Sequence, residues 1–95
     1  MIKVKLIIFF SFKDSLDNGG EISVEVPDKA NVKKVLMKVS EKFPEIEPKL
    51  LEESGELKRF IQIRLNQSNI ERLEGLETRV KEGDELLILP KLGGG

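Results

Sequence analysis

The sequence predicts an α+β fold in which a mixed sheet of four to five strands carries one main helix on one face. Apolar and polar residues alternate over residues 2–12 and 21–26, which is the period of a half-buried strand. The spacing changes to that of an amphipathic helix over 32–43, returns to strand-like alternation over 59–66, and is followed by an apolar, strand-like run within residues 81–90. A chain of 95 residues has room for one such domain with one hydrophobic core.

The first two segments are expected to form a hairpin. In residues 2–12 one face is apolar throughout, and the other becomes apolar at Ile7 and Phe9. We therefore expect a central strand that is partly covered on both sides. Residues 21–26 alternate cleanly, and the turn-rich stretch 13–20 between the two segments suits an antiparallel connection.

The helix is predicted from residues that share one face at helical spacing: Val32, Val35, Leu36, Val39 and Phe43. Asn31 is the expected N-cap, because its side-chain oxygen can accept a hydrogen bond from a free amide of the first turn. Pro44 should end the helix, since proline disfavours helical geometry in the residue before it. A second short helical turn is expected within residues 44–53, with Ile46, Leu50 and Leu51 beneath the domain.

The second half of the chain should supply the remaining strands. Residues 59–66 place Ile61, Ile63 and Leu65 opposite Phe60, Gln62 and Arg64. Residues 67–80 indicate a turn and a short edge strand. A tight turn at Gly83-Asp84 opens the last strand, in which Leu86 and Ile88 face away from Leu87 and Leu89, and Pro90 ends it.

This order of elements restricts the topology. A hairpin followed by a helix and more strands does not alternate as a doubly wound fold does. A right-handed crossover through the helix would place the last strand parallel to the first, in the centre of the sheet. That is a β-grasp arrangement, although the periodicity alone fits other α+β sheets equally well. We expect residues 1–90 to form the domain and residues 91–95 to form a flexible tail.

The composition excludes several classes of function. A net charge of −1 with interspersed signs argues against nucleic-acid binding, and no apolar run is long enough for a membrane span. The chain has no Cys and no His, so it lacks the usual nucleophile, general base and metal ligands. The acidic stretches 45–56 and 71–77 are interpreted as solvated surface. We expect a cytoplasmic, monomeric protein that is not an enzyme and binds no metal or cofactor.

The stretch "VKEGDELLILPKLGGG" resembles the C-terminus of the MoaD/ThiS family of sulfur carriers. In that family a Gly-Asp-Glu turn opens the last strand, which is followed by proline and a tail ending in Gly-Gly. The segments "KVKLIIFFSFK", "NVKKVLMKVSEKFPEI" and "IRLNQ" also match the family's order of elements, so the resemblance covers essentially the whole chain. It implies a ubiquitin-like β-grasp fold, of the length found in molybdopterin synthase small subunits and ubiquitin-related modifiers.

The resemblance implies that Gly93, Gly94 and Gly95 form the reactive end. A ubiquitin-activating-type enzyme, similar to MoeB or ThiF, would adenylate the terminal carboxylate and convert it to a thiocarboxylate. That enzyme must supply the ATP site, because this chain has no phosphate-binding loop. Glycine suits a narrow catalytic channel, since it accepts any backbone conformation. The family has two terminal glycines where this chain has three, so the working terminus is either Gly95 or Gly94.

The expected destination of the sulfur is molybdopterin, with the large subunit of molybdopterin synthase as acceptor. Two alternatives share the activation step: sulfur transfer to a transfer RNA base, and conjugation to lysines in the manner of ubiquitin. A third alternative is a non-covalent β-grasp interaction domain whose terminus is inert.

Activation also requires a docking surface. Ile7, Phe9, Leu87 and Leu89 should form an apolar patch on the sheet face opposite the helix, beside the root of the tail. Phe60 would extend this patch, Arg64 would line its rim, and Leu92 in the tail would also contact the partner. Alternatively, a loop or the short edge strand covers these side chains.

Overall fold

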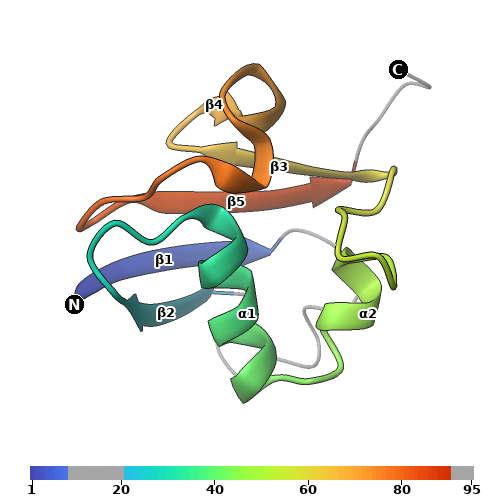
Figure 1. The fold of residues 1–95 in the computed structure, drawn as a ribbon, viewed down its shortest axis with the longest axis horizontal. Helices are drawn as coiled ribbons and strands as arrows, with labels where there is room; N and C mark the ends of the chain where they lie inside the picture. The colour runs from blue at the N-terminus through green and yellow to red at the C-terminus, as the bar shows by residue number, and fades with distance from the viewer. Residues whose placement is uncertain (9–20, 91–95) are drawn as a thin grey trace.

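The computed structural model of the chain describes residues 1–8 and 21–90 (Figure 1). Its sheet has five strands in the order β2-β1-β5-β3-β4. Their bounds are Ile2–Ile8 for β1, Glu21–Val26 for β2, Ile61–Leu65 for β3, Ser68–Asn69 for β4 and Glu85–Pro90 for β5. Helix α1, Val32–Lys42, crosses one face of the sheet, and the short α2, Glu47–Leu50, lies at the end of that layer. The predicted α+β, β-grasp fold is confirmed.

Strands β1 and β2 form the predicted antiparallel pair. Their register runs from Ile2 opposite Val26 to Ile7 opposite Glu21. On both strands the side chains that point toward α1 are buried, apart from the partly buried Ile2, because alternate residues of a strand face the same side. The expected continuation of the first strand to residue 12 and the turn at 13–20 fall outside the described residues.

Strand β5 lies between β1 and β3, as the crossover rule predicts. It runs parallel to β1, with Leu86 beside Leu6, and antiparallel to β3, with Leu86 beside Leu65. The turn into β5 is closed by a hydrogen bond from the Asp84 amide to the Lys81 carbonyl, 3.0 Å. Gly83 occupies the third position of this turn at φ 83°, a conformation that favours glycine.

Helix α1 begins and ends where the sequence indicates. The Asn31 side chain accepts a hydrogen bond from the Lys34 amide, 2.9 Å, which confirms the N-cap. The helix ends at Lys42, with Phe43 as its C-cap directly before Pro44. The apolar face of α1 is fully buried against the sheet, and the predicted second helical turn is α2, which buries Leu50. Neither of the two α-helices in the described part of the chain is long and apolar enough to cross a membrane.

The segment between β3 and β5 is more structured than its sequence suggests. A two-residue hairpin at Asn66 and Gln67 joins β3 to the edge strand β4, and both of these residues have positive φ, 58° and 132°. Two 3₁₀ turns follow, η2 at Ile70–Arg72 and η3 at Gly75–Glu77. Ile70 is buried in the core, so this segment is anchored beneath the sheet edge and not only looped over it.

Candidate functional site: the sheet face opposite helix α1

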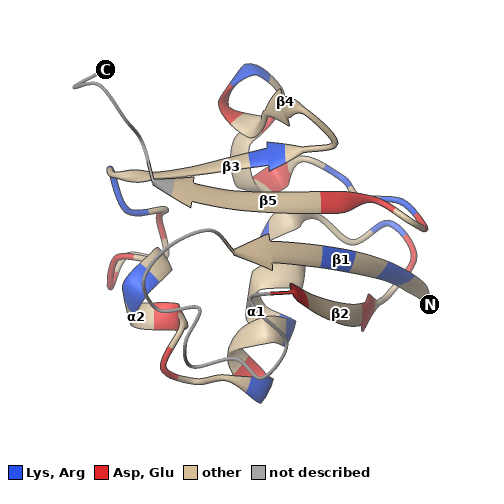
Figure 2. Cartoon of the chain, turned by 180° about the vertical axis from the view of Figure 1, so that it is seen from behind, with Lys and Arg blue, Asp and Glu red and all other residues tan. Residues whose placement is uncertain are grey.

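The sheet face opposite α1 is the candidate site. Figure 2 shows this face, in which charged residues occupy the starts of β1 and β5 and uncharged residues occupy their ends. Ile7 of β1 is in register with Leu87 of β5, and Leu87 is in register with Arg64 of β3. Leu89 lies beside Gln62 at the end of β5. The topology therefore brings residues from three separate parts of the sequence onto one surface.

We call Ile7, Leu87 and Leu89 the sheet-face patch. All three side chains are half-buried, whereas their neighbours on the opposite face, such as Leu86 and Ile88, are completely buried. The structure thus brings together three of the four apolar residues that the sequence indicates, and the fourth, Phe9, falls outside the described residues. An apolar surface of this kind on a small domain is typical of a partner interface.

Phe60 and Arg64 are the two other predicted contact residues within the described part of the chain. Phe60 is 59% exposed and precedes Ile61, whose backbone pairs with Pro90 at the end of β5. The Arg64 guanidinium donates two hydrogen bonds to the Gln67 carbonyl, from Nε at 3.3 Å and from Nη2 at 2.9 Å. The structure therefore places a positioned cation beside Leu87 of β5 and an exposed aromatic residue directly before β3.

One ion pair on this face was not selected from the sequence. The Lys5 ammonium lies 3.1 Å from the Glu21 carboxylate across β1 and β2. The hydrogen bond to Glu21 and its negative charge raise the pKa of Lys5 above its ordinary value. The outward positions carry lysines on β1 and glutamates on β2, and this opposition of charge is the signal that could have indicated the pair. This charged end of the face lies away from the root of the tail.

The tail begins where β5 ends, at Pro90. The predicted reactive residues Gly93, Gly94 and Gly95 and the predicted contact residue Leu92 fall outside the described residues, so their roles stay predictions. Their point of attachment is nevertheless fixed by the sheet. Because β5 is flanked by β1 and β3, the backbone at Ile88 is held from both sides. The last residues of the chain therefore leave from a rigid central strand.

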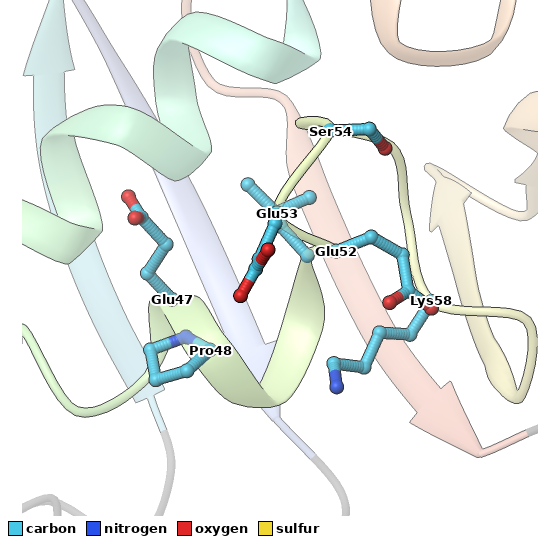
Figure 3. Close-up of a pocket in the computed structure, with 7 residues that line it drawn as sticks. Glu47, Pro48, Glu52, Glu53, Ser54 and Lys58 are labelled. Carbon is cyan, nitrogen blue, oxygen red and sulfur yellow. The ribbon is translucent and has the colours of Figure 1, made fainter.

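A hollow of about 620 Å³ lies elsewhere, beside α2, and is open to solvent. Figure 3 shows Glu47, Glu52, Glu53 and Lys58 around it. The carboxylates point in different directions and do not converge on one position. Among the described residues, no cluster of three or more acidic side chains could hold a metal ion. The geometry agrees with the interpretation of this acidic stretch as solvated surface.

Comparisons with known proteins give the family of the chain. The model of the ThiS family matches residues 7–95. A candidate sulfur carrier protein of Archaeoglobus fulgidus is 36% identical over 78 residues, which are 82% of this chain and 88% of that protein.

Two solved structures are also similar in sequence and fold. The small archaeal modifier protein 1 of Methanosarcina acetivorans is 32% identical with a TM-score of 0.82, over 100% of this chain and 98% of that one. A chain of the BexX/CysO complex of Amycolatopsis orientalis is 34% identical with a TM-score of 0.75, over 97% and 99%. This chain therefore belongs to the ThiS family, whose members include small ubiquitin-like sulfur carriers and modifiers.

Proposed function

We propose that this protein is a sulfur carrier whose C-terminal glycine is adenylated by a partner enzyme and then converted to a thiocarboxylate. The observation that carries the proposal is the position of β5. This strand leads directly into the glycine-rich segment 91–95 and also bears Leu87 and Leu89 of the sheet-face patch. A partner that docks on the patch would bind next to the root of that segment.

The chemistry requires two steps, and neither uses a catalytic side chain of this protein. An oxygen of the Gly95 carboxylate attacks the α-phosphorus of ATP, and pyrophosphate leaves, so that the acyl carbon carries AMP as a leaving group. Sulfide, free or delivered by the partner, then attacks the acyl carbon and expels AMP. A C–S bond replaces a C–O bond, and the product is a thiocarboxylate. If the last glycine is first trimmed, Gly94 takes the same role.

The contribution of this chain is then positioning. Docking of the half-buried Ile7, Leu87 and Leu89 removes apolar surface from water and fixes the base of the tail relative to the enzyme. Holding a reacting group in place removes much of the entropic barrier to a bimolecular step. Glycines beyond that point allow the carboxylate to enter a narrow site, because they have no side chain to exclude.

The experiment is an intact-mass measurement. The protein is incubated with ATP, sodium sulfide and a MoeB- or ThiF-like activating enzyme, and one oxygen of the chain should be replaced by sulfur. A variant that lacks Gly94 and Gly95 is the matched control and should keep its original mass. An unchanged mass of the full chain, together with no ATP–pyrophosphate exchange, would exclude the carrier function and leave a non-covalent interaction domain.

We further propose molybdopterin as the destination of the sulfur, with the large subunit of molybdopterin synthase as acceptor. Sulfur transfer from the thiocarboxylate to the molybdopterin precursor in the presence of that subunit is the test. Thiolation of transfer RNA instead would assign the second sulfur pathway.

The similarity to a small archaeal modifier protein supports one other candidate, conjugation to lysines. This function would produce conjugates of higher mass in the presence of ATP, with glycine remnants on lysines after proteolysis. Conjugates formed without any thiocarboxylate intermediate would favour the modifier function over the carrier function.

A further inference from the structure

A second hollow, of about 370 Å³, lies beside β3 on the sheet face opposite α1. We call it the arginine pocket, because Arg64 and Arg72 both line it. The hairpin residue Gln67 and the apolar side chain of Leu73 also line it, together with amide and hydroxyl side chains from β3 and β4. None of the residues that line the pocket is acidic. A protein with a net charge of −1 thus carries a local concentration of positive charge here.

The Arg64 guanidinium is fixed in this pocket. Two of its five N–H donors, one on Nε and one on Nη2, are directed to the Gln67 carbonyl. Within residues 1–8 and 21–90 the three remaining donors bind no other group, so they can bind an acceptor. Gln67 has φ 132°, a backbone conformation that is strained for a residue with a side chain, and it presents its carbonyl to Arg64 in this conformation. The pocket therefore holds a guanidinium whose orientation is set before any ligand binds.

Arg72 is the second cation, and it is available for binding. Its side chain is exposed, and it forms no ion pair with any residue in the described ranges 1–8 and 21–90. Glu71 is adjacent in sequence, but its carboxylate does not line the pocket, and its amide donates to Asn69, 2.9 Å. Two guanidinium groups with free donors in one hollow are suited to carboxylates, which accept two parallel hydrogen bonds from each.

The position of the pocket relates it to the docking surface. Arg64 is in register with Leu87 of the sheet-face patch, so the pocket and the patch are adjacent on one face. Leu73, which is 46% exposed, adds an apolar contact at the far side of the pocket. A ligand that occupies both the pocket and the sheet-face patch would carry acidic groups next to an apolar side chain.

We propose that the arginine pocket binds an acidic segment of the protein that docks on the sheet-face patch, with Asp or Glu carboxylates held by Arg64 and Arg72. The proposal rests on the proposed function, because the docking protein is the enzyme that activates the tail. It adds the chemistry by which that partner is recognised: the patch supplies apolar contact, and the pocket selects a carboxylate at one side of it. Charged contacts at an interface rim steer association and fix orientation.

The pocket suits an acidic protein segment better than RNA. RNA-binding surfaces combine an extended positive groove with aromatic side chains on which bases stack. The arginine pocket has two cations, and no aromatic residue is among those that line it. A compact pair of arginines beside a leucine matches a short acidic and apolar peptide.

The first experiment needs no partner enzyme. The ¹⁵N-labelled protein is titrated with the peptide acetyl-Glu-Leu-Glu-amide and followed by NMR. We expect saturable shifts of the Arg64 and Arg72 Nε–H signals and of the amides of residues 67–73, which weaken at high salt. Arg72→Gln should reduce the affinity by about tenfold, because the charge-assisted hydrogen bonds to one carboxylate are lost. Arg79→Gln, at an exposed arginine outside the pocket, should bind as the wild type does.

Three results would overturn the proposal: equal affinity of wild type and Arg72→Gln, shifts confined to residues outside the pocket, or tighter binding of a hexauridylate RNA than of the peptide. Arg64→Gln is a second variant, so the test can still be made if Arg72→Gln does not fold.

ATP–pyrophosphate exchange by the activating enzyme separates this proposal from the proposed function. Arg72→Gln should raise the KM for the carrier with kcat unchanged. Wild-type protein that supports no exchange contradicts the proposed function, whereas equal KM values contradict only the role of the pocket.

Discussion

Asn66 connects the β3–β4 hairpin to the start of β5, and its replacement should destabilise the sheet. Its side-chain amide donates to the Asp84 carboxylate, 3.0 Å, and its side-chain oxygen accepts from the Glu85 amide, 3.0 Å. Asp84 in turn accepts from the Lys81 amide, 2.7 Å, within the turn that opens β5. Asn66→Ala removes both side-chain hydrogen bonds. It also places alanine at φ 58°, a left-handed conformation that asparagine adopts more readily than alanine does.

The magnitude follows from these two losses. Each exposed hydrogen bond contributes about 0.5–1.5 kcal/mol, and alanine in the left-handed region costs roughly 1 kcal/mol more than asparagine. The free energy of unfolding of Asn66→Ala should therefore fall by about 2–4 kcal/mol. For a domain of this size that corresponds to a Tm lower by roughly 10–30 °C.

Chemical denaturation followed by circular dichroism measures this change. Asn66→Gly is the matched variant, because it also loses the hydrogen bonds but adopts positive φ without strain. It should be more stable than Asn66→Ala. If both variants unfold at the wild-type midpoint, Asn66 does not couple the hairpin to β5. Equal destabilisation of the two would assign the whole effect to the hydrogen bonds.

Four further predictions concern the core, the docking surface, the tail and pH. Leu36, 1% exposed in the middle of α1, should cost about 2–5 kcal/mol when replaced by alanine, and an unchanged denaturation midpoint would contradict the assigned helix face. Leu87→Asp should leave the protein folded and weaken binding of the activating enzyme by about tenfold or more in calorimetry, whereas equal affinity would remove Leu87 from the interface. Deleting Gly94 and Gly95 should leave Tm unchanged but abolish ATP–pyrophosphate exchange, because the terminal carboxylate would lie about 7 Å short of the α-phosphorus of ATP. Exchange at the wild-type rate would refute this. The pKa of Lys5 is raised by its pairing with Glu21, so this pair should stabilise the fold below the unfolded-state pKa and cease to do so as pH rises through the folded-state value; unfolding followed against pH should show this alkaline dependence in the wild type and not in Lys5→Met, and equal pH profiles would contradict it.

Local sequence signals were sufficient for most of the architecture. The change from a period of two to a period of 3.6 identified β1, β2, α1 and β3, because burial on one side imposes that pattern directly. Asn31 and Pro44 marked the limits of α1 for reasons of backbone hydrogen bonding and sterics. The central position of β5 followed from chain connectivity and not from any residue. The same alternation predicts which residues of β1 and β5 share the face opposite α1 and so form the sheet-face patch.

The features that escaped prediction depend on contacts between distant segments. The link from Asn66 to Asp84 and Glu85 joins residues that are far apart in the chain, and no local pattern indicates it. The arginine pocket likewise requires η2 to fold back beside β3, which brings Arg72 near Arg64. Both depend on Asn66 and Gln67 adopting positive φ, although the sequence there lacks the glycine that usually signals such a hairpin.

The parallel pairing of β1 with β5 also affects how the chain reaches its native state. The two strands at the centre of the sheet come from the beginning and the end of the domain, so the central pairing must close a loop of nearly the whole chain. Such non-local pairings slow folding relative to helical proteins of similar size. During synthesis the sheet cannot close until residues 85–90 have left the ribosome. The docking surface on β1 and β5 consequently forms only once translation has reached the tail, and a nascent chain would offer no assembled surface for a partner to bind.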